Sequence, residues 1–149
     1  FFYRLTLAAG GSGTPPERLR RALRSIAEFA RDSRRLTAGL LRDGMNGERE
    51  VAAFVARNFP RHVPLLFALF EEGVKRGDFR RVPPPFFMSF CMAAINAPGV
   101  VLTLLEDHGA RRPFGRTLAD LERDLLSDGA LDERVDMVLA ALATSRRRA

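Results

Sequence analysis

The feature that most constrains this chain is a stretch without any charged residue, from Val82 to Leu105. Its length is sufficient for a membrane span, but Pro83–Pro85 open it and the sequence 96–99, Asn-Ala-Pro-Gly, interrupts it. The apolar runs on either side are too short to cross a bilayer, so we predict no membrane association. We predict instead a buried helix over about 84–107, bent at its internal proline. A helix that is apolar on nearly every side must be covered all round, and in so small a chain a partner subunit is the expected cover.

The rest of the sequence favours helices separated by short turns. Apolar residues recur at intervals of three and four, Thr14 and Glu17 form a capping-box pattern, and Thr117 marks a second helix start. We place a break near Pro60 and Pro64, a turn at 127–129 and the start of the last helix near Asp132. These patterns predict an all-α fold, a helical bundle of about six to seven helices. Residues 1–13 are predicted to be the end of a connecting helix and a flexible linker, and 14–149 the folded domain.

Composition excludes several classes of function. The chain has one cysteine, Cys91, and two histidines far apart, which gives neither a disulfide framework nor a metal-ligand cluster. It has no phosphate-binding glycine loop and no nucleophile elbow, so we predict no enzyme, no metal and no cofactor. A lone cysteine fits a reducing cytoplasm. The formal net charge is +6, but the arginines alternate with acids, which is typical of a solvated surface rather than of a nucleic-acid patch.

Three stretches in order carry a resemblance to a known family. Residues 64–80 are a leucine-rich helix followed by an acidic-glycine run and a Gly-Asp-Phe-Arg turn; the uncharged helix follows directly; and 133–142, ERVDMVLAAL, read as a closing helix. From Glu17 to Ala143 the sequence thereby resembles the C-terminal effector-binding and dimerisation domain of TetR-type transcriptional regulators. Val82 departs from that pattern, because the family often has an acid there. The family's helix-turn-helix head has no room in this chain, and residues 1–9 fit only the end of its connecting helix.

The resemblance implies a homodimeric regulator, expected to be a repressor, that reads operator DNA through the absent N-terminal head. It implies a four-helix dimer interface formed by the helices 84–107 and 132–145 of each subunit, which agrees with their apolar faces. The candidates for this interface are Ile95, Val101, Leu104, Val135, Val138, Leu139 and Leu142.

The earlier helices are expected to enclose a pocket for a small effector that changes operator affinity. With twelve phenylalanines, one tyrosine and no tryptophan, the aromatic residues favour an apolar cavity and an apolar or aromatic ligand. The candidates to line it are Phe54, Phe67, Phe70, Phe87, Phe90, Met92 and Asn96; each could also be an ordinary core residue. Two alternatives stay open: a helical dimer that binds a small molecule or a protein with no DNA role, and a small helical enzyme or membrane-associated protein.

Overall fold

The structure, a computed structural model, describes residues 2–58 and 63–144. This part of the chain contains eight α-helices and one short 3-10 helix, and its only β-type pairing is an isolated bridge. The predicted all-helical fold is confirmed, and the segment predicted as the end of a connecting helix forms a helix over 2–10. The helices are α1 (Phe2–Gly10), α2 (Pro15–Asp32), α3 (Arg34–Met45), α4 (Arg49–Asn58), α5 (Val63–Arg76), α6 (Pro84–Asp107), α7 (Leu118–Leu126) and α8 (Asp128–Leu142).

Local capping explains where several helices begin. Thr14 and Glu17 form the predicted capping box of α2, in which the Thr14 amide donates to the Glu17 carboxylate at 2.8 Å. Thr117 caps α7, also as predicted. The predicted turn at 127–129 is wrong, because Ser127 caps α8 by accepting a hydrogen bond from the amide of Ala130. The helix therefore begins one turn earlier than the sequence pattern indicated. The predicted break at Pro60 lies outside the described residues.

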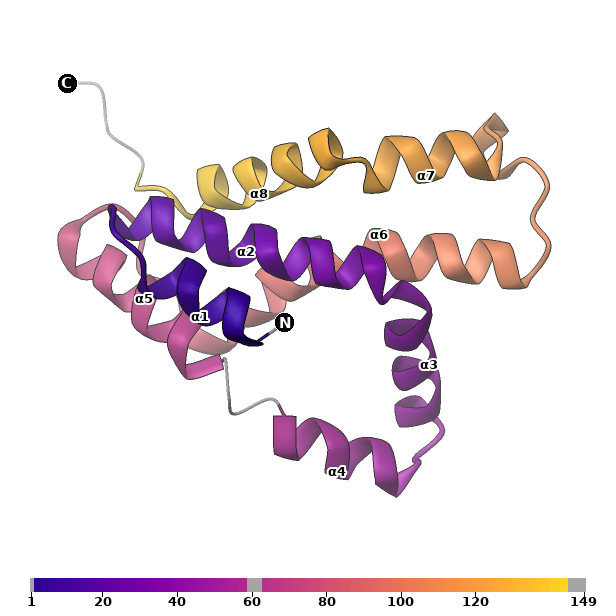
Figure 1. Cartoon of the computed structure of the whole chain (residues 1–149), viewed down its shortest axis with the longest axis horizontal. Helices are drawn as coiled ribbons and strands as arrows, with labels where there is room; N and C mark the ends of the chain where they lie inside the picture. Colours follow the sequence, from indigo (N-terminus) through magenta and orange to yellow (C-terminus); the bar gives the residue numbers. More distant parts are fainter. Residues whose placement is uncertain (1, 59–62, 145–149) are drawn as a thin grey trace.

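Helix α2 runs through the middle of the molecule, and the other helices are arranged around it (Figure 1). Helices α7 and α8 follow each other along one side, α5 and α1 lie at one end, and α3 and α4 turn away at the other. One main core joins α1, α2, α5, α6 and α8. Leu5 and Ala9 of α1 are fully buried in that core, so the segment predicted as the end of a connecting helix packs with the rest of the domain.

Helix α6 spans its predicted range as one helix that continues through Pro98. Its few polar side chains bond within the helix: the Asn96 amide donates to the Met92 carbonyl at 2.8 Å, and the Thr103 hydroxyl donates to the Gly99 carbonyl at 2.9 Å. Because these bonds leave the polar groups satisfied, α6 can be apolar on both its inner and its outer face.

Acidic side chains of α8 pair with the arginines of α2. Arg20 pairs with Asp136, Arg24 with Asp132 at 2.7 Å, and both Arg24 and Arg31 with Asp128. The pairing order is that of two antiparallel helices. Exposed pairs of this kind contribute little energy each, but they fix the register of α8 on α2. Much of the positive charge of the chain is therefore paired within the fold.

Cys91 lies on the inner face of α6 and is 1% exposed. Burial raises the pKa of its thiol from about 9 to about 12, so the folded protein holds a neutral thiol at pH 8. We expect Ellman's reagent to label it at least a hundredfold more slowly in native buffer than in 6 M guanidinium, because few molecules carry a thiolate. Since unfolded chains ionise above about pH 9, unfolding free energy should fall as pH rises beyond that value. Equal labelling rates in both solvents would show that the core is open.

Candidate functional site

The candidate site is formed where α5 ends and the chain turns back. Gly77 has a φ of 79°, a left-handed conformation that suits glycine. The amide of Asp78 donates to the Gly73 carbonyl at 2.9 Å, and the amide of Gly77 to the Val74 carbonyl at 3.1 Å. These two bonds are the pair that defines a Schellman motif. The motif ends α5 and sends the chain back along the helix that it has just left.

Phe79 fixes the returning chain against α5. Its ring lies where a side chain on Gly73 would be, and it stacks on Phe70 with the ring centroids 5.8 Å apart. The amide of Arg80 donates to the Leu142 carbonyl at 2.9 Å, and the amide of Thr144 donates to the Asp78 carbonyl at 3.1 Å. The connection between α5 and α6 is thereby attached to the end of α8 as well as to α5.

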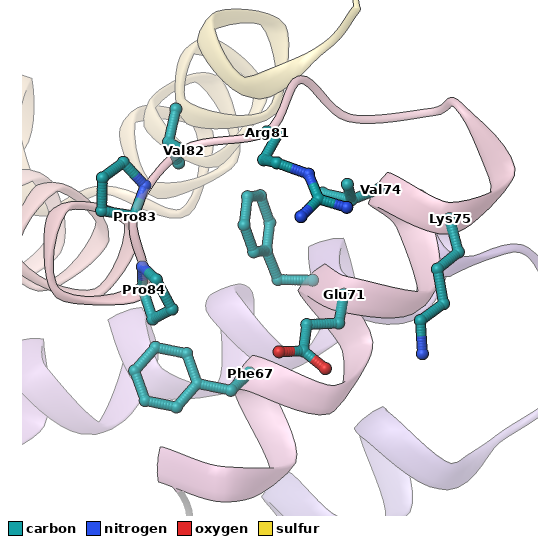
Figure 2. A pocket seen from close by; sticks show the side chains of 9 residues that line it. Phe67, Glu71, Val74, Lys75, Arg81, Val82, Pro83 and Pro84 are labelled. Carbon is teal, nitrogen blue, oxygen red and sulfur yellow. The ribbon is translucent and has the colours of Figure 1, made fainter.

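A cavity of about 550 Å³ lies between α5 and this connection (Figure 2). Pro83 holds the chain extended, with ψ at 139°, and the next two prolines open α6, where the missing amide hydrogens are not needed. The volume is within the usual range for small-ligand sites. The cavity is lined by Phe67, Phe70, Glu71, Val74, Lys75, Arg81, Val82, Pro83 and Pro84.

The floor of the cavity belongs to a cluster of four phenylalanines. Phe70 stacks on Phe87 with the ring centroids 4.2 Å apart, and the ring centroid of Phe67 lies 6.1 Å from that of Phe87. Phe79 completes the cluster through Phe70. Because Phe70 and Phe87 are almost fully buried, the floor is continuous with the main core and is held in place by it. A ligand on this floor would meet a rigid aromatic surface.

Three charged side chains stand at the mouth of the cavity. Arg81 extends from the connection toward α5, which carries Glu71 and Lys75 (Figure 2). All three are exposed, and none of them forms an ion pair within residues 2–58 and 63–144. The cavity therefore has an apolar floor and a mouth with two cationic groups and one carboxylate.

The structure brings together only part of the predicted ligand-lining set. Phe67 and Phe70 line the cavity, and Phe87 lies behind them in the core. Phe90 and Met92 are partly buried against the core, and Asn96 bonds to its own helix. Phe54 is 44% exposed on α4, which packs mainly against α3 at the far end of the molecule. Sequence reasoning missed the lining residues of the connection, although the glycine turn followed by three prolines was a signal that the chain reverses there.

The predicted dimer-interface residues are divided between two surfaces. Val101 and Leu104 are exposed, at 43% and 48%. The other five face the chain's own core and are at most 8% exposed: Ile95, Val135, Val138, Leu139 and Leu142. The apolar stripe of α8 is already covered within the subunit, because α8 packs on α2 and α6. These five side chains therefore have almost no surface left for a partner subunit to cover.

On its other side α6 exposes a regular apolar stripe. The stripe contains Phe86, Phe90, Ala93, Ala97, Val101 and Leu104, which are exposed except for the half-buried Phe90. Successive members are three or four residues apart, so they lie on one helical face. We call this set the outer stripe of α6. It carries no charge and no described helix covers it.

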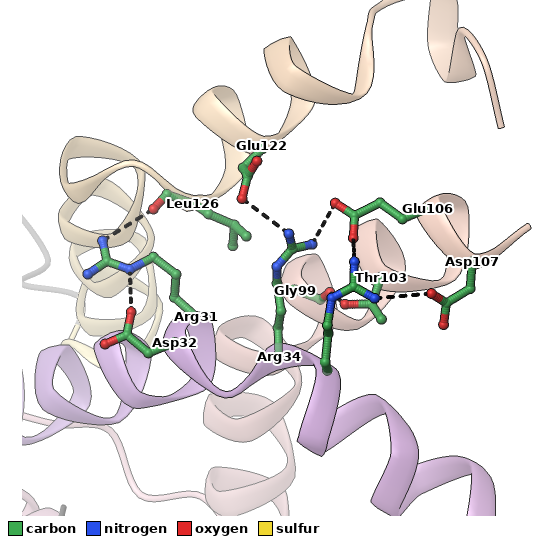
Figure 3. Close-up of polar contacts among 10 residues, drawn as sticks. Arg31, Asp32, Arg34, Gly99, Thr103, Glu106, Asp107, Glu122 and Leu126 are labelled. Atoms are coloured by element: carbon green, nitrogen blue, oxygen red, sulfur yellow. Dashed lines mark hydrogen bonds and ion pairs between the residues drawn. The ribbon is translucent and has the colours of Figure 1, made fainter. Parts of the chain in front are cut away.

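A second cavity, of about 430 Å³, lies at the junction of α2 and α3 and is lined by residues 31–36. Its arginines are already paired (Figure 3). Arg34 pairs with Glu106 at 2.9 Å and with Glu122 at 3.2 Å, and Arg35 also pairs with Glu106. This network joins the start of α3 to the end of α6 and to α7. We assign it to structure rather than to ligand binding, because its charges are neutralised internally.

Two further observations concern metals and membranes. No group of three or more histidine, cysteine or acidic side chains that could hold a metal ion occurs in the described part of the chain. By length and composition, helix α6 could cross a membrane. Of its most apolar 18-residue stretch, 33% is buried in the fold. Core helices of other proteins meet the same criteria.

Comparison with known proteins gives no match: no family model fits the chain, and no curated protein or solved structure is similar to it. The functional assignment therefore rests on the sequence and the geometry of the fold.

The close contact in the turn can be tested with Gly73→Ala. A Cβ at this position would overlap the ring of Phe79, so we expect a loss of about 1–3 kcal/mol in the free energy of unfolding, although alanine favours helix. The matched control is Gly129→Ala, which meets no atom within 4 Å and should be neutral or slightly stabilising. Urea unfolding followed by circular dichroism measures both. Equal stability of the two variants would contradict the proposed packing of the turn.

Proposed function

We propose that this chain is the effector-binding and dimerisation domain of a TetR-like transcriptional regulator. In this proposal it acts in the cytoplasm, as a homodimer and without catalysis. A small ligand in the cavity beside α5 changes the geometry of the dimer, and thereby the affinity of an N-terminal helix-turn-helix domain for operator DNA. The observation that carries the proposal is the outer stripe of α6, an uncharged face that one subunit leaves exposed to water.

The spacing of the outer stripe suits pairing with a second copy. Around a two-fold axis near residue 95, an antiparallel α6 would place Phe86 opposite Leu104 and Phe90 opposite Val101. Ala93 would face Ala97 at the centre, where small side chains allow two helices to approach closely. Large aromatic residues at one end thus meet aliphatic residues at the other. Such self-complementarity is what a two-fold interface requires.

A second copy is a better cover for this stripe than a lipid bilayer. The inner face of α6 packs on α2, α3, α7 and α8, helices whose outer surfaces carry many charges. Glu106 in the last turn of α6 is paired with Arg34 of α3. A spanning α6 would have to expose that inner face to lipid and leave these charges without water. The predicted dimer therefore uses α6 and does not need the occupied stripe of α8.

In this proposal the cavity must influence two regions, the outer stripe of α6 and helix α1 at the N-terminal side. It is connected to both. Its wall at Pro83 and Pro84 leads directly into α6, two residues before the outer stripe begins. On the other side, Glu72 of α5 accepts a hydrogen bond from Arg18 at 2.8 Å, and Arg18 also donates to the Ala9 carbonyl at the end of α1. A ligand that moves α5 relative to the connection between α5 and α6 would shift both the start of α6 and the hydrogen bond between Glu72 and Arg18. A difference in affinity for the two geometries is sufficient to change their populations.

The dimer is tested by Val101→Glu. The wild-type chain should have twice its 16.6 kDa mass at micromolar concentration, and a carboxylate in the apolar interface should make it a monomer, because a buried unpaired charge is costly. Size-exclusion chromatography with light scattering measures the mass. The matched control is Leu41→Glu on α3, a residue that is 50% exposed and is not part of the outer stripe; this variant should stay dimeric.

Two outcomes would overturn the interface: a monomeric wild type, or a Val101→Glu variant that remains a dimer with native circular dichroism. Co-sedimentation of the wild type with phosphatidylcholine–phosphatidylglycerol vesicles, lost in the same variant, would assign the stripe to a membrane instead.

The alternative is a dimeric ligand-binding or protein-binding module with no DNA role, which the same stripe and cavity would serve equally. The coding sequence immediately upstream of Phe1 distinguishes them. A basic segment with a helix-turn-helix pattern supports the regulator, whereas a different upstream domain would support the alternative.

A further inference from the structure

The charges around the cavity identify the class of ligand more closely than its apolar floor does. We propose that the cavity binds an amphipathic monocarboxylate, with its apolar body on Phe67 and Phe70 and its carboxylate on the guanidinium of Arg81. This inference rests on the proposed ligand-binding role of the domain. It adds an anionic group to the apolar or aromatic effector that the sequence led us to expect.

The pairing of Arg81 differs from that of several arginines that join helices of the fold to one another. Arg18, Arg24, Arg31 and Arg34 are each held by at least one acidic side chain. Arg81 stands at the mouth of a cavity and has no acidic partner within residues 2–58 and 63–144. A guanidinium offers a planar fork of donors that matches a carboxylate with two parallel hydrogen bonds. The unpaired guanidinium of Arg81 is therefore available to a ligand carboxylate at the mouth of the cavity.

The wall that carries Arg81 also favours this assignment. The neighbouring amide of Arg80 is bonded to the Leu142 carbonyl, and Val82 and Pro83 follow as part of the lining. The backbone just before residue 81 is thus held by a hydrogen bond, while the Arg81 side chain remains exposed and reaches over the cavity (Figure 2). An anchored backbone with an unpaired, extendable cation suits the capture of an anion at the mouth.

The charges at the rim limit the number of anionic groups that the ligand can carry. Lys75 adds a second positive group at the rim, whereas Glu71 adds one carboxylate. In Figure 2 the ammonium group of Lys75 points away from the space between Phe67 and Pro84, whereas Glu71 lies on the cavity side of α5. Arg81 therefore attracts one anionic group, and Glu71 repels a second one. The arrangement selects a monoanion over a dianion and over a neutral molecule of the same shape.

The test compares carboxylates with their uncharged primary amides. The probes are benzoate, 2-naphthoate and octanoate, each paired with its amide, and calorimetric titration at pH 7 and low salt measures affinity for the full chain. We expect at least one carboxylate to bind at millimolar concentration or tighter, and about tenfold or more tightly than its amide, because a charge-assisted pair is stronger than a neutral hydrogen bond. This preference should shrink in 0.5 M NaCl.

Matched variants separate the guanidinium from general charge. Arg81→Gln should remove the preference for the carboxylate and leave amide binding unchanged. Arg80→Gln removes the same charge from a residue that does not line the cavity and should preserve the preference. Glu71→Gln should increase carboxylate affinity severalfold, which keeps the test valid if Arg81→Gln were to unfold. Each variant is checked by circular dichroism and by its mass in solution.

The outcomes are distinguishable from those of the proposed function. Binding of no probe, equal binding of carboxylates and amides, or an unaltered preference in folded Arg81→Gln would overturn the monocarboxylate assignment. In each of these cases the dimer, measured by mass, could still stand. A monomeric wild type that nonetheless binds carboxylates through Arg81 would overturn the proposed dimer and keep this inference.

Discussion

The fold depends on the need to remove α6 from water. This helix has no charge over its first six turns, and its inner face is occupied by Phe87, Cys91 and Ile95, all almost fully buried. Burying side chains of this size is the main stabilising contribution available to a chain of such length. Helices α2, α3, α7 and α8 all pack on α6. No helix in the described part of the chain covers the outer stripe.

Charge pairing then decides how the surrounding helices are oriented. Helix α2 is strongly amphipathic, with Leu19, Leu23 and Ile26 inward and arginines outward, and those arginines meet the acids of α8 in antiparallel order. At the other end, Arg34 joins α3 to α6 and α7. Each pair contributes little by itself, but a shifted register would break these pairs.

The proposed ligand site and the proposed interface meet at the start of α6. The phenylalanine cluster holds α5 against α6, and the proline segment joins the cavity to the first residue of the outer stripe. A ligand between α5 and this segment would act on the position of α6 without contacting the partner subunit. Coupling of this kind requires only that the two dimer geometries differ in the width of the cavity.

The sequence by itself determined the helical class, most helix limits and the special position of α6, because hydrophobic spacing, caps and prolines are local signals. It also marked Phe67 and Phe70, which lie one turn apart on one face of α5. Tertiary structure alone decided that the Val135–Leu142 face of α8 turns inward onto α2, that Phe54 lies far from the cavity, and that Arg81 stands above it. Periodicity shows that a helical face must be covered, but not by which partner. Contacts between residues distant in the chain, such as that of Arg80 with Leu142, exist only once the helices have packed.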